Sequence, residues 1–320
     1  MFGRKIITTF LVSAASLALV AGCSNGNAHR SEGSNRVAIL TYTRKDEFTN
    51  NLVNSMKESA ENKGLSADVY NSESDGEKQI RQVKKAVGMH YKAILIRPID
   101  ADNAQEITAI AGDIPVVFFN LQPDRRYLKA DNYVYVGPKE ETAGRMQADY
   151  ILKHTSKQSL NVAVLRGQSG LTSEKRTSSF KEALQKSGRT VNYVFNDYAD
   201  WNEDTAEHQT EMFLKTGQTC DVLVANNDNM ALGALKAFRK EGRKLPVICG
   251  IDASTEAEKS ISRGQMSFTV RQPYKIQGEK CIETALAMSK GKQVTDIKGS
   301  SADGCYVYTG FTPVSGDDLR

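Results

Sequence analysis

The stretch YKAILIRPIDADNAQEITAIAGDIPVVFFN, residues 91–120, decides the fold class. Two short apolar runs, YKAILIRP (91–98) and PVVFFN (115–120), enclose a stretch that reads as helix. A strand that is apolar throughout is buried on both faces, and strands separated by helices belong to parallel sheets. This segment therefore predicts one strand–helix–strand unit of a parallel sheet that is covered by helices on both sides.

The same alternation continues along most of the chain. Helical patterns at 47–64, 77–89 and 140–154 separate further apolar or β-branched runs. The strand candidates are 37–42, 66–71, 91–98, 115–120, 133–137, 161–167, 190–196, 221–227, 246–252 and 267–272. This number of strands is larger than a single open sheet usually contains.

We therefore predict an α/β protein with two doubly wound parallel-sheet lobes joined by a hinge. The first change of lobe falls near Gly137, between a strand and the helix that follows it. The first lobe is assigned residues 37–137 plus 272–298, and the second lobe residues 138–271 plus 299–320.

The N-terminus has the layout of a secretion signal. Arg4 and Lys5 precede a mostly apolar run at 6–20. A membrane-spanning helix needs about 20 apolar residues, and this run is shorter and interrupted by Ser and Thr. We therefore predict export and disfavour a permanent transmembrane helix.

The apolar run ends at LVAGC, residues 19–23, which resembles the bacterial lipoprotein box. The resemblance implies a signal peptide at 1–22 and a lipid on Cys23, which would anchor the mature protein to the outer cell surface or in the periplasm. Residues 23–36 are rich in Gly, Ser and Asn, which is typical of a flexible tether. An ordinary signal peptide with an incidental Cys23 is the alternative.

Composition excludes some classes of partner and site. The chain has 42 Lys and Arg against 38 Asp and Glu, with no basic run and a single Trp, so nothing indicates nucleic-acid binding. The remaining cysteines form no CxxC pair, so we predict no zinc site, and their pairing is left open. They are Cys220, Cys249, Cys281 and Cys305.

Signatures of catalysis are missing. The chain contains no GxxxxGK[ST], GxGxxG or HExxH, and its histidines lie outside the strand ends, so we predict neither an enzyme nor a cofactor. The adjacent carboxylates Glu140 and Glu141 are interpreted as solvated surface.

Polar and aromatic residues follow the predicted strands. In open parallel sheets, ligands bind outside the carboxyl ends of the strands. The candidates there are Asp46, Phe48, Asn120, Arg176, Trp201, Asn227, Asp252 and Gln272. Forked or planar hydrogen-bonding groups plus two flat rings suit a sugar, whose hydroxyls need donors and acceptors and whose C–H face needs an apolar surface.

Each candidate also has a structural alternative. Asp46 and Asn227 are good helix N-caps, and Asp252 also suits a cap. A lone Trp is more often part of a core, and Arg176 lies in a charged helix start. The ligand-site hypothesis therefore rests on the joint placement of all eight at strand ends.

Several of these stretches resemble the periplasmic sugar-binding proteins of ABC importers, and within them the galactose/glucose-binding type. The resemblance covers nearly all of 37–314, and its carriers include TYTRKDEF (41–48), PVVFFNLQP (115–123), LVANNDNMALGALKA (223–237) and PVICGIDASTEA (246–257). It implies the type I periplasmic binding protein fold.

The resemblance also implies roles for the candidates. Asp46 and Asn120 would hold ring hydroxyls from the first lobe, and Phe48 would stack on one sugar face. From the second lobe, Arg176, Asn227 and Asp252 would supply polar contacts, while Trp201 would cover the opposite face. Gln272 stands where the galactose/glucose type has an asparagine.

Two departures bear on the ligand. LTSEK (171–175) is one residue shorter than in the galactose/glucose type and lacks its ligand-binding His and Asp, so a pentose or a modified sugar is an alternative to a hexose. TSKQSL (155–160) is too short and lacks the carboxylates of the calcium loop, so no metal is predicted. The resemblance implies a monomeric receptor that delivers a monosaccharide to an ABC permease. A sensor subunit for a chemoreceptor or histidine kinase is the alternative.

Overall fold

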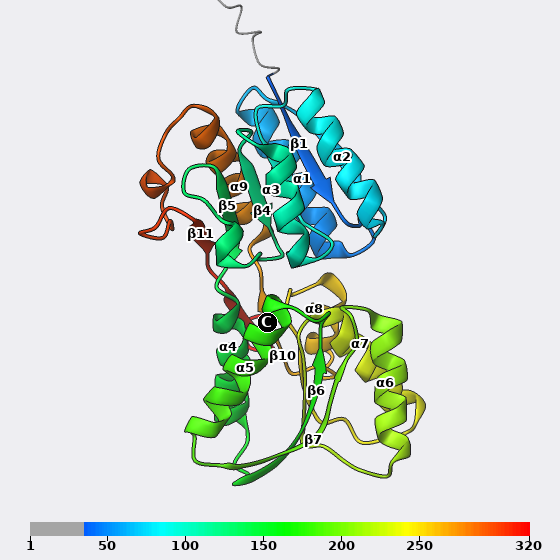
Figure 1. Ribbon diagram of the computed structural model, residues 1–320. Helices are drawn as coiled ribbons and strands as arrows, with labels where there is room; N and C mark the ends of the chain where they lie inside the picture. The colour runs from blue at the N-terminus through cyan, green and yellow to red at the C-terminus, as the bar shows by residue number, and fades with distance from the viewer. Residues whose placement is uncertain (1–34) are drawn as a thin grey trace, which may run out of the picture. The chain divides into compact units, whose positions relative to one another are not determined.

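The structure, a computed structural model, describes residues 35–320, which fold into two sheets flanked by helices (Figure 1). The predicted signal peptide, Cys23 and nearly all of the predicted tether lie outside the described residues. Both predicted lobes are present as α/β units, so the predicted fold class is confirmed.

The first sheet is parallel throughout, with the strand order β11-β5-β4-β3-β1-β2. Its strands are β1 (Arg36–Thr41), β2 (Ser66–Asn71), β3 (Ile94–Ile96), β4 (Val116–Phe119), β5 (Tyr133–Pro138) and β11 (Tyr306–Thr309). Helices α1 (Glu47–Asn62) and α9 (Tyr274–Ser289) cover one face, and α2 (Gly76–Gly88) and α3 (Ala104–Ala111) cover the other.

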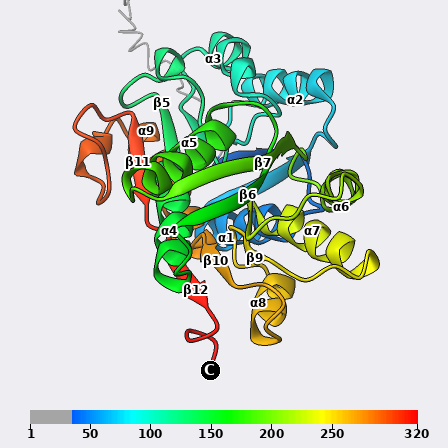
Figure 2. The ribbon, with the colours of Figure 1, turned by 90° about the horizontal axis from the view of Figure 1, so that it is seen from below.

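The second sheet has the order β12-β10-β9-β8-β6-β7, and only β12 runs antiparallel to its neighbour. Its strands are β6 (Ser159–Arg166), β7 (Thr190–Tyr198), β8 (Val222–Ala225), β9 (Val247–Cys249), β10 (Phe268–Arg271) and β12 (Thr312–Ser315). Its helices are α4 (Glu140–His154), α5 (Leu171–Lys186), α6 (Glu203–Lys215), α7 (Asp228–Lys240) and α8 (Thr255–Ser262). Figure 2 shows α4 and α5 on one side of β6 and α6 and α7 on the other.

Five of the helices begin at polar caps. The side chains of Asp46, Asp75, Asn202, Asn227 and Ser254 each accept a hydrogen bond from a backbone N–H in the first turn of the next helix. Such caps satisfy N–H groups that have no partner inside the helix. They fix where each chain segment turns away from its sheet, and so where the strand-end side chains lie.

The chain crosses between the sheets three times: between β5 and α4, between β10 and α9, and between β11 and β12. The third crossing corrects the predicted boundary, because we assigned all of 299–320 to the second lobe. Tyr306–Thr309 pairs with Tyr133–Pro138 in the first sheet, and only Thr312–Ser315 joins the second.

Candidate functional site

All eight candidate residues line a single cavity between the two lobes, which leaves a space of about 50 Å³ in this structure. They are Asp46, Phe48, Asn120, Arg176, Trp201, Asn227, Asp252 and Gln272. Ligand pockets typically combine apolar walls with a few convergent polar groups. The geometry therefore provides one shared site for side chains that are spread over more than two hundred positions of the chain.

The first lobe contributes Asp46, Phe48 and Asn120. One oxygen of the Asp46 carboxylate accepts from the Thr49 backbone N–H at 2.8 Å, and the other accepts from the Tyr42 hydroxyl at 3.3 Å. Asp46 is thus both a helix cap and a wall of the cavity, and the two interpretations do not exclude each other. Phe48 packs into the first-lobe core and lines the cavity as well.

The second lobe contributes Trp201 and Asn227 next to each other. The Asn227 side chain caps α7 by accepting from the Met230 N–H at 3.0 Å, and its amide donates to the Trp201 carbonyl at 3.2 Å. This contact fixes the backbone of the loop that carries the indole. The indole ring itself packs against Gly167, where a Cβ atom would approach the ring to 2.2 Å.

Arg176 is almost fully buried beside the indole. Its Nε donates to Glu140 at 2.6 Å, its Nη1 donates to the Asn226 carbonyl at 2.7 Å, and its guanidinium carbon lies 5.7 Å from the centre of the Trp201 ring. The carboxylate of Glu140 is completely buried, so our interpretation of this residue as solvated surface was wrong. The pairing explains the burial, because an ionised carboxylate enters a protein interior only with a partner.

Two further carboxylates lie at the ends of β8 and β9. Asp252 accepts a hydrogen bond from the Gln272 amide, and burial raises its pKa well above the usual range despite the nearby Arg176. Asp228 accepts from the Ser254 N–H at 2.7 Å and the Thr269 hydroxyl at 2.6 Å, and burial raises its pKa to about 7.

Unusual backbone conformations gather at the cavity. Asn120, Trp201 and Asp252 have φ values of 61°, 64° and 122°, in the region that normally favours glycine. Such conformations cost free energy, and they cluster at functional sites, where the surrounding structure holds them in place. The strain therefore supports the assignment of this cavity as the functional site.

Sequence reasoning missed part of the lining. The other lining residues are Tyr42, Thr49, Arg97, Leu121, Thr172 and Asn229. Arg97 directly follows β3, so the strand-end rule that found the other candidates also applies to it. The guanidinium carbon of Arg97 lies 3.7 Å from the centre of the Tyr42 ring. Its Nη1 donates to the carbonyls of Pro98 at 2.7 Å and Ile99 at 3.1 Å.

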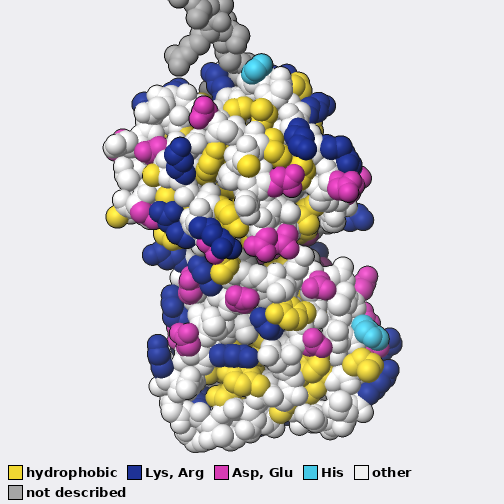
Figure 3. Space-filling view, in the orientation of Figure 1, with side chains coloured by type: hydrophobic (Ala, Val, Ile, Leu, Met, Phe, Trp, Pro, Cys, Tyr) yellow, Lys and Arg dark blue, Asp and Glu magenta, His cyan; other side chains and the backbone are white. Residues whose placement is uncertain are grey.

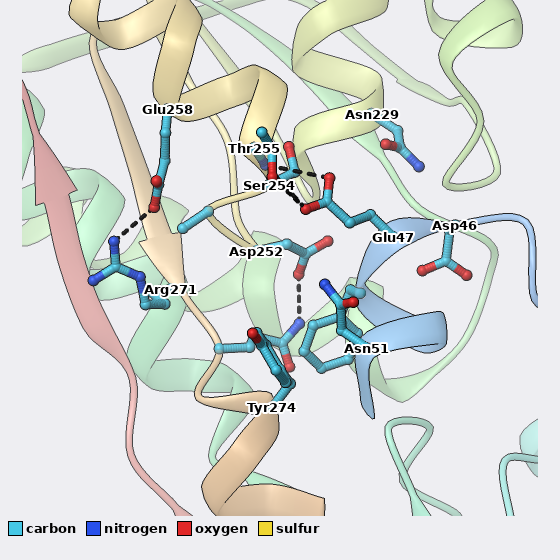
Figure 4. A pocket seen from close by; sticks show the side chains of 13 residues that line it. Asp46, Glu47, Asn51, Asn229, Asp252, Ser254, Thr255, Glu258, Arg271 and Tyr274 are labelled. Atoms are coloured by element: carbon cyan, nitrogen blue, oxygen red, sulfur yellow. Dashed lines mark hydrogen bonds and ion pairs between the residues drawn. The ribbon is translucent and has the colours of Figure 1, made fainter. Parts of the chain in front are cut away.

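An outer cavity of about 340 Å³ adjoins the inner one and shares Asp46, Asp252 and Gln272 with it. Figure 4 shows Glu47 at its edge, pointing from the first lobe towards Thr255 of the second. The Glu47 carboxylate accepts from the Thr255 hydroxyl at 2.6 Å and from the Thr255 N–H at 3.2 and 3.3 Å. These bonds join the two lobes at the mouth of the site.

The described residues offer little for other chemistry. Within residues 35–320, no three His, Cys, Asp or Glu side chains gather as a metal site would require. Cys220, Cys249, Cys281 and Cys305 are free thiols. In this same range, no helix combines the length and apolar character needed to cross a membrane.

Charges of both signs are interspersed on the face shown in Figure 3, without a continuous basic stripe. The inner cavity instead combines acceptors (Asp46 and Asp252), forked donors (Arg97 and Arg176) and aromatic rings. Such a set can hold a polyhydroxylated ring by hydrogen bonds at its edges and apolar contact at its faces.

Comparisons with known proteins agree with this geometry. The family model of the periplasmic binding protein domain matches residues 37–293. The D-galactose/methyl-galactoside binding periplasmic protein of Haemophilus influenzae is 28% identical over 90% of this chain and 91% of its own length. A putative rhizopine-binding protein of Rhizobium meliloti is 28% identical over 78% of this chain and 82% of its own.

Among solved structures, an ABC transporter solute-binding protein from Bacillus halodurans with bound myo-inositol superposes with a TM-score of 0.79. It is 24% identical in sequence, and the match covers 90% of this chain and 97% of that one. Proteins of this family are extracytoplasmic solute-binding components of transport systems and not enzymes. The chain belongs to the periplasmic binding protein family.

Proposed function

We propose that this protein captures one monosaccharide, a hexose of the galactose or glucose type, between its two lobes and delivers it to the permease of an ABC transporter. The observation that carries the proposal is the single cavity lined by all eight strand-end residues. The relatives named for galactose, rhizopine and ribose binding support a small polyhydroxylated ligand.

The proposed contacts follow from the positions of the side chains. Phe48 and Trp201 come from opposite lobes and would cover opposite faces of the ring. Asp46 would accept from hydroxyls on the first-lobe side, and Asp252 and Asn227 would bind those on the second-lobe side. Because both lobes touch the ligand, its binding favours the closed arrangement over the open one. A permease can then distinguish the loaded receptor from the empty one.

We propose that a lipid on Cys23 holds the receptor at the membrane. The support is the LVAGC sequence at 19–23 and the Gly, Ser and Asn-rich stretch that follows it. Replacing Cys23 by Ser should release the protein from the membrane fraction of cells and abolish metabolic labelling with a fatty acid. Retention of the variant in that fraction, with its label, would contradict the anchor.

A thermal-shift screen of residues 36–320 against hexoses, pentoses and cyclitols tests the ligand class. A ligand at a hundred times its Kd stabilises the folded state by about 2.7 kcal/mol, which raises Tm by several degrees. We expect galactose or glucose to give the largest shift, and chromatography should recover the sugar unaltered. A larger shift with ribose or myo-inositol would keep the receptor function but reject the hexose, and no shift with any of them would reject the function.

A further inference from the structure

The ion pair between Arg176 and Glu140 is the most deeply buried one among the described residues. The Arg176 and Glu140 side chains are 4% and 0% exposed, and Nε lies 2.6 Å from the carboxylate. Burying an ion pair costs desolvation free energy and often gives no net stability. Because burial of this pair costs free energy and the pair lies beside the binding cavity, a role in ligand binding explains its presence better than stability does.

The pair fixes the orientation of the guanidinium. A guanidinium has five N–H donors in a rigid plane, and two contacts at different nitrogens are enough to set that plane. Here Nε donates to Glu140 and Nη1 donates to the Asn226 carbonyl at 2.7 Å. Arg176 lines the cavity, and among residues 35–320 no hydrogen-bond acceptor is found for its Nη2.

Everything that holds Arg176 belongs to the second lobe. Glu140 is the first residue of α4, directly after the crossing from β5, and Asn226 follows β8. The Trp201 ring, 5.7 Å from the guanidinium carbon, lies on the same lobe. Arg176 is therefore held in place whether or not the first lobe closes over the site. Such preorganisation reduces the entropy that is lost on binding.

We propose that Glu140 is a positioning residue for ligand binding: it holds the Arg176 guanidinium in the orientation that presents Nη2 to the sugar. This inference rests on the proposed sugar-binding function. It assigns a role to a side chain that cannot touch the ligand, because the Glu140 carboxylate is completely buried and does not line the cavity.

Glu140→Gln is the variant that tests the proposal. The amide oxygen of glutamine can accept from Arg176 Nε, and its NH2 group would replace Oε1, which has no hydrogen-bond partner among the described residues. The variant keeps the shape and removes the charge. Because charge-assisted bonds are roughly twice as strong as neutral ones, we expect sugar affinity to fall about tenfold or more.

Glu141→Gln is the matched control. Glu141 is the next residue, is half-exposed, and pairs with Lys175 at 3.1 Å rather than with Arg176. Its substitution should change the affinity less than about twofold, because exposed pairs contribute little. Both variants are compared with the unmodified protein by titration calorimetry, and circular dichroism checks their folding.

A double-mutant cycle with Arg176→Gln separates positioning from general destabilisation. If Glu140 acts through Arg176, adding Glu140→Gln to Arg176→Gln should leave the affinity unchanged within about twofold. Ligand-observed NMR can measure the weak variants. The double variant contains no unpaired buried charge, so its affinity can be measured even if Glu140→Gln alone does not fold, and circular dichroism checks the folding of Arg176→Gln, which leaves Glu140 without its partner.

The outcomes distinguish the two hypotheses. Two results would overturn the positioning role and leave sugar binding intact. One is an unchanged sugar affinity in Glu140→Gln. The other is that Glu140→Gln lowers the affinity by the same factor whether residue 176 is Arg or Gln. If the unmodified protein binds none of the sugars tested, the proposed function and this inference fail together.

Discussion

The contact between Glu47 and Thr255 predicts that closure is tuned from outside the ligand cavity. Glu47 begins α1 in the first lobe, and Thr255 begins α8 in the second. The carboxylate accepts from the Thr255 hydroxyl at 2.6 Å and from its N–H at 3.2 and 3.3 Å. We predict that Glu47→Ala weakens sugar binding by destabilising the closed arrangement of the lobes.

The expected size follows from the type of contact. Both residues are exposed. A carboxylate at a helix N-terminus contributes about 0.3–1 kcal/mol. We therefore expect a loss of about 1 kcal/mol, which corresponds to a roughly fivefold weaker apparent affinity. The loss should shrink at high salt, because salt screens exposed charges.

Titration calorimetry with several sugars measures the effect. Glu47 does not line the inner cavity, so the order of preference among sugars should stay the same. Glu256→Ala is the control, because Glu256 lies in the first turn of the same helix but pairs with Lys259 of its own lobe. Unchanged affinity in Glu47→Ala, or an equal loss in Glu256→Ala, would refute the reasoning.

Three further variants test the site and its surroundings. Trp201→Ala should abolish measurable hexose binding and leave the circular dichroism spectrum intact; an unchanged calorimetric affinity would remove Trp201 from the site. Gly167→Ala places a methyl group 2.2 Å from carbons of the indole ring, so the ring must move. The fluorescence emission of this single tryptophan should therefore shift, and the sugar affinity should fall about tenfold. An unchanged emission spectrum would contradict the packing of the ring against Gly167. Burial raises the pKa of Asp228 from 3.8 to about 7, so its contribution to stability is present below pH 4 and is lost as the pH rises through 7. Urea unfolding of Asp228→Asn should therefore show a flatter pH dependence between pH 4 and 7, and an identical slope in both proteins would contradict the shift.

The eight candidate residues lie around one cavity because one rule of parallel sheets governs their positions. Most strand candidates end in or are followed by a polar or aromatic residue, and the carboxyl ends of parallel strands meet at one edge of the sheet. The same rule applies to Arg97, which was missed although it directly follows the apolar run 91–96.

Features that depend on distant pairing were not predictable in this way. β11 is a run of four residues that pairs with β5, which precedes it by some 170 positions of the chain. Its residues, YVYT, favour a strand, but a run of four does not show which sheet it joins, so the third crossing could not be predicted. Glu140 was interpreted as surface because its neighbour Glu141 is charged, and only the packing of Arg176 against it explains its burial.

A crystal structure of residues 36–320 with the sugar that gives the largest thermal shift tests the central claim most directly. We predict one monosaccharide between Phe48 and Trp201, within hydrogen-bonding distance of Asp46, Asn227 and Asp252. Density for the sugar at another place, such as the separate cavity beside Cys220, with the inner cavity holding only water, would contradict the account.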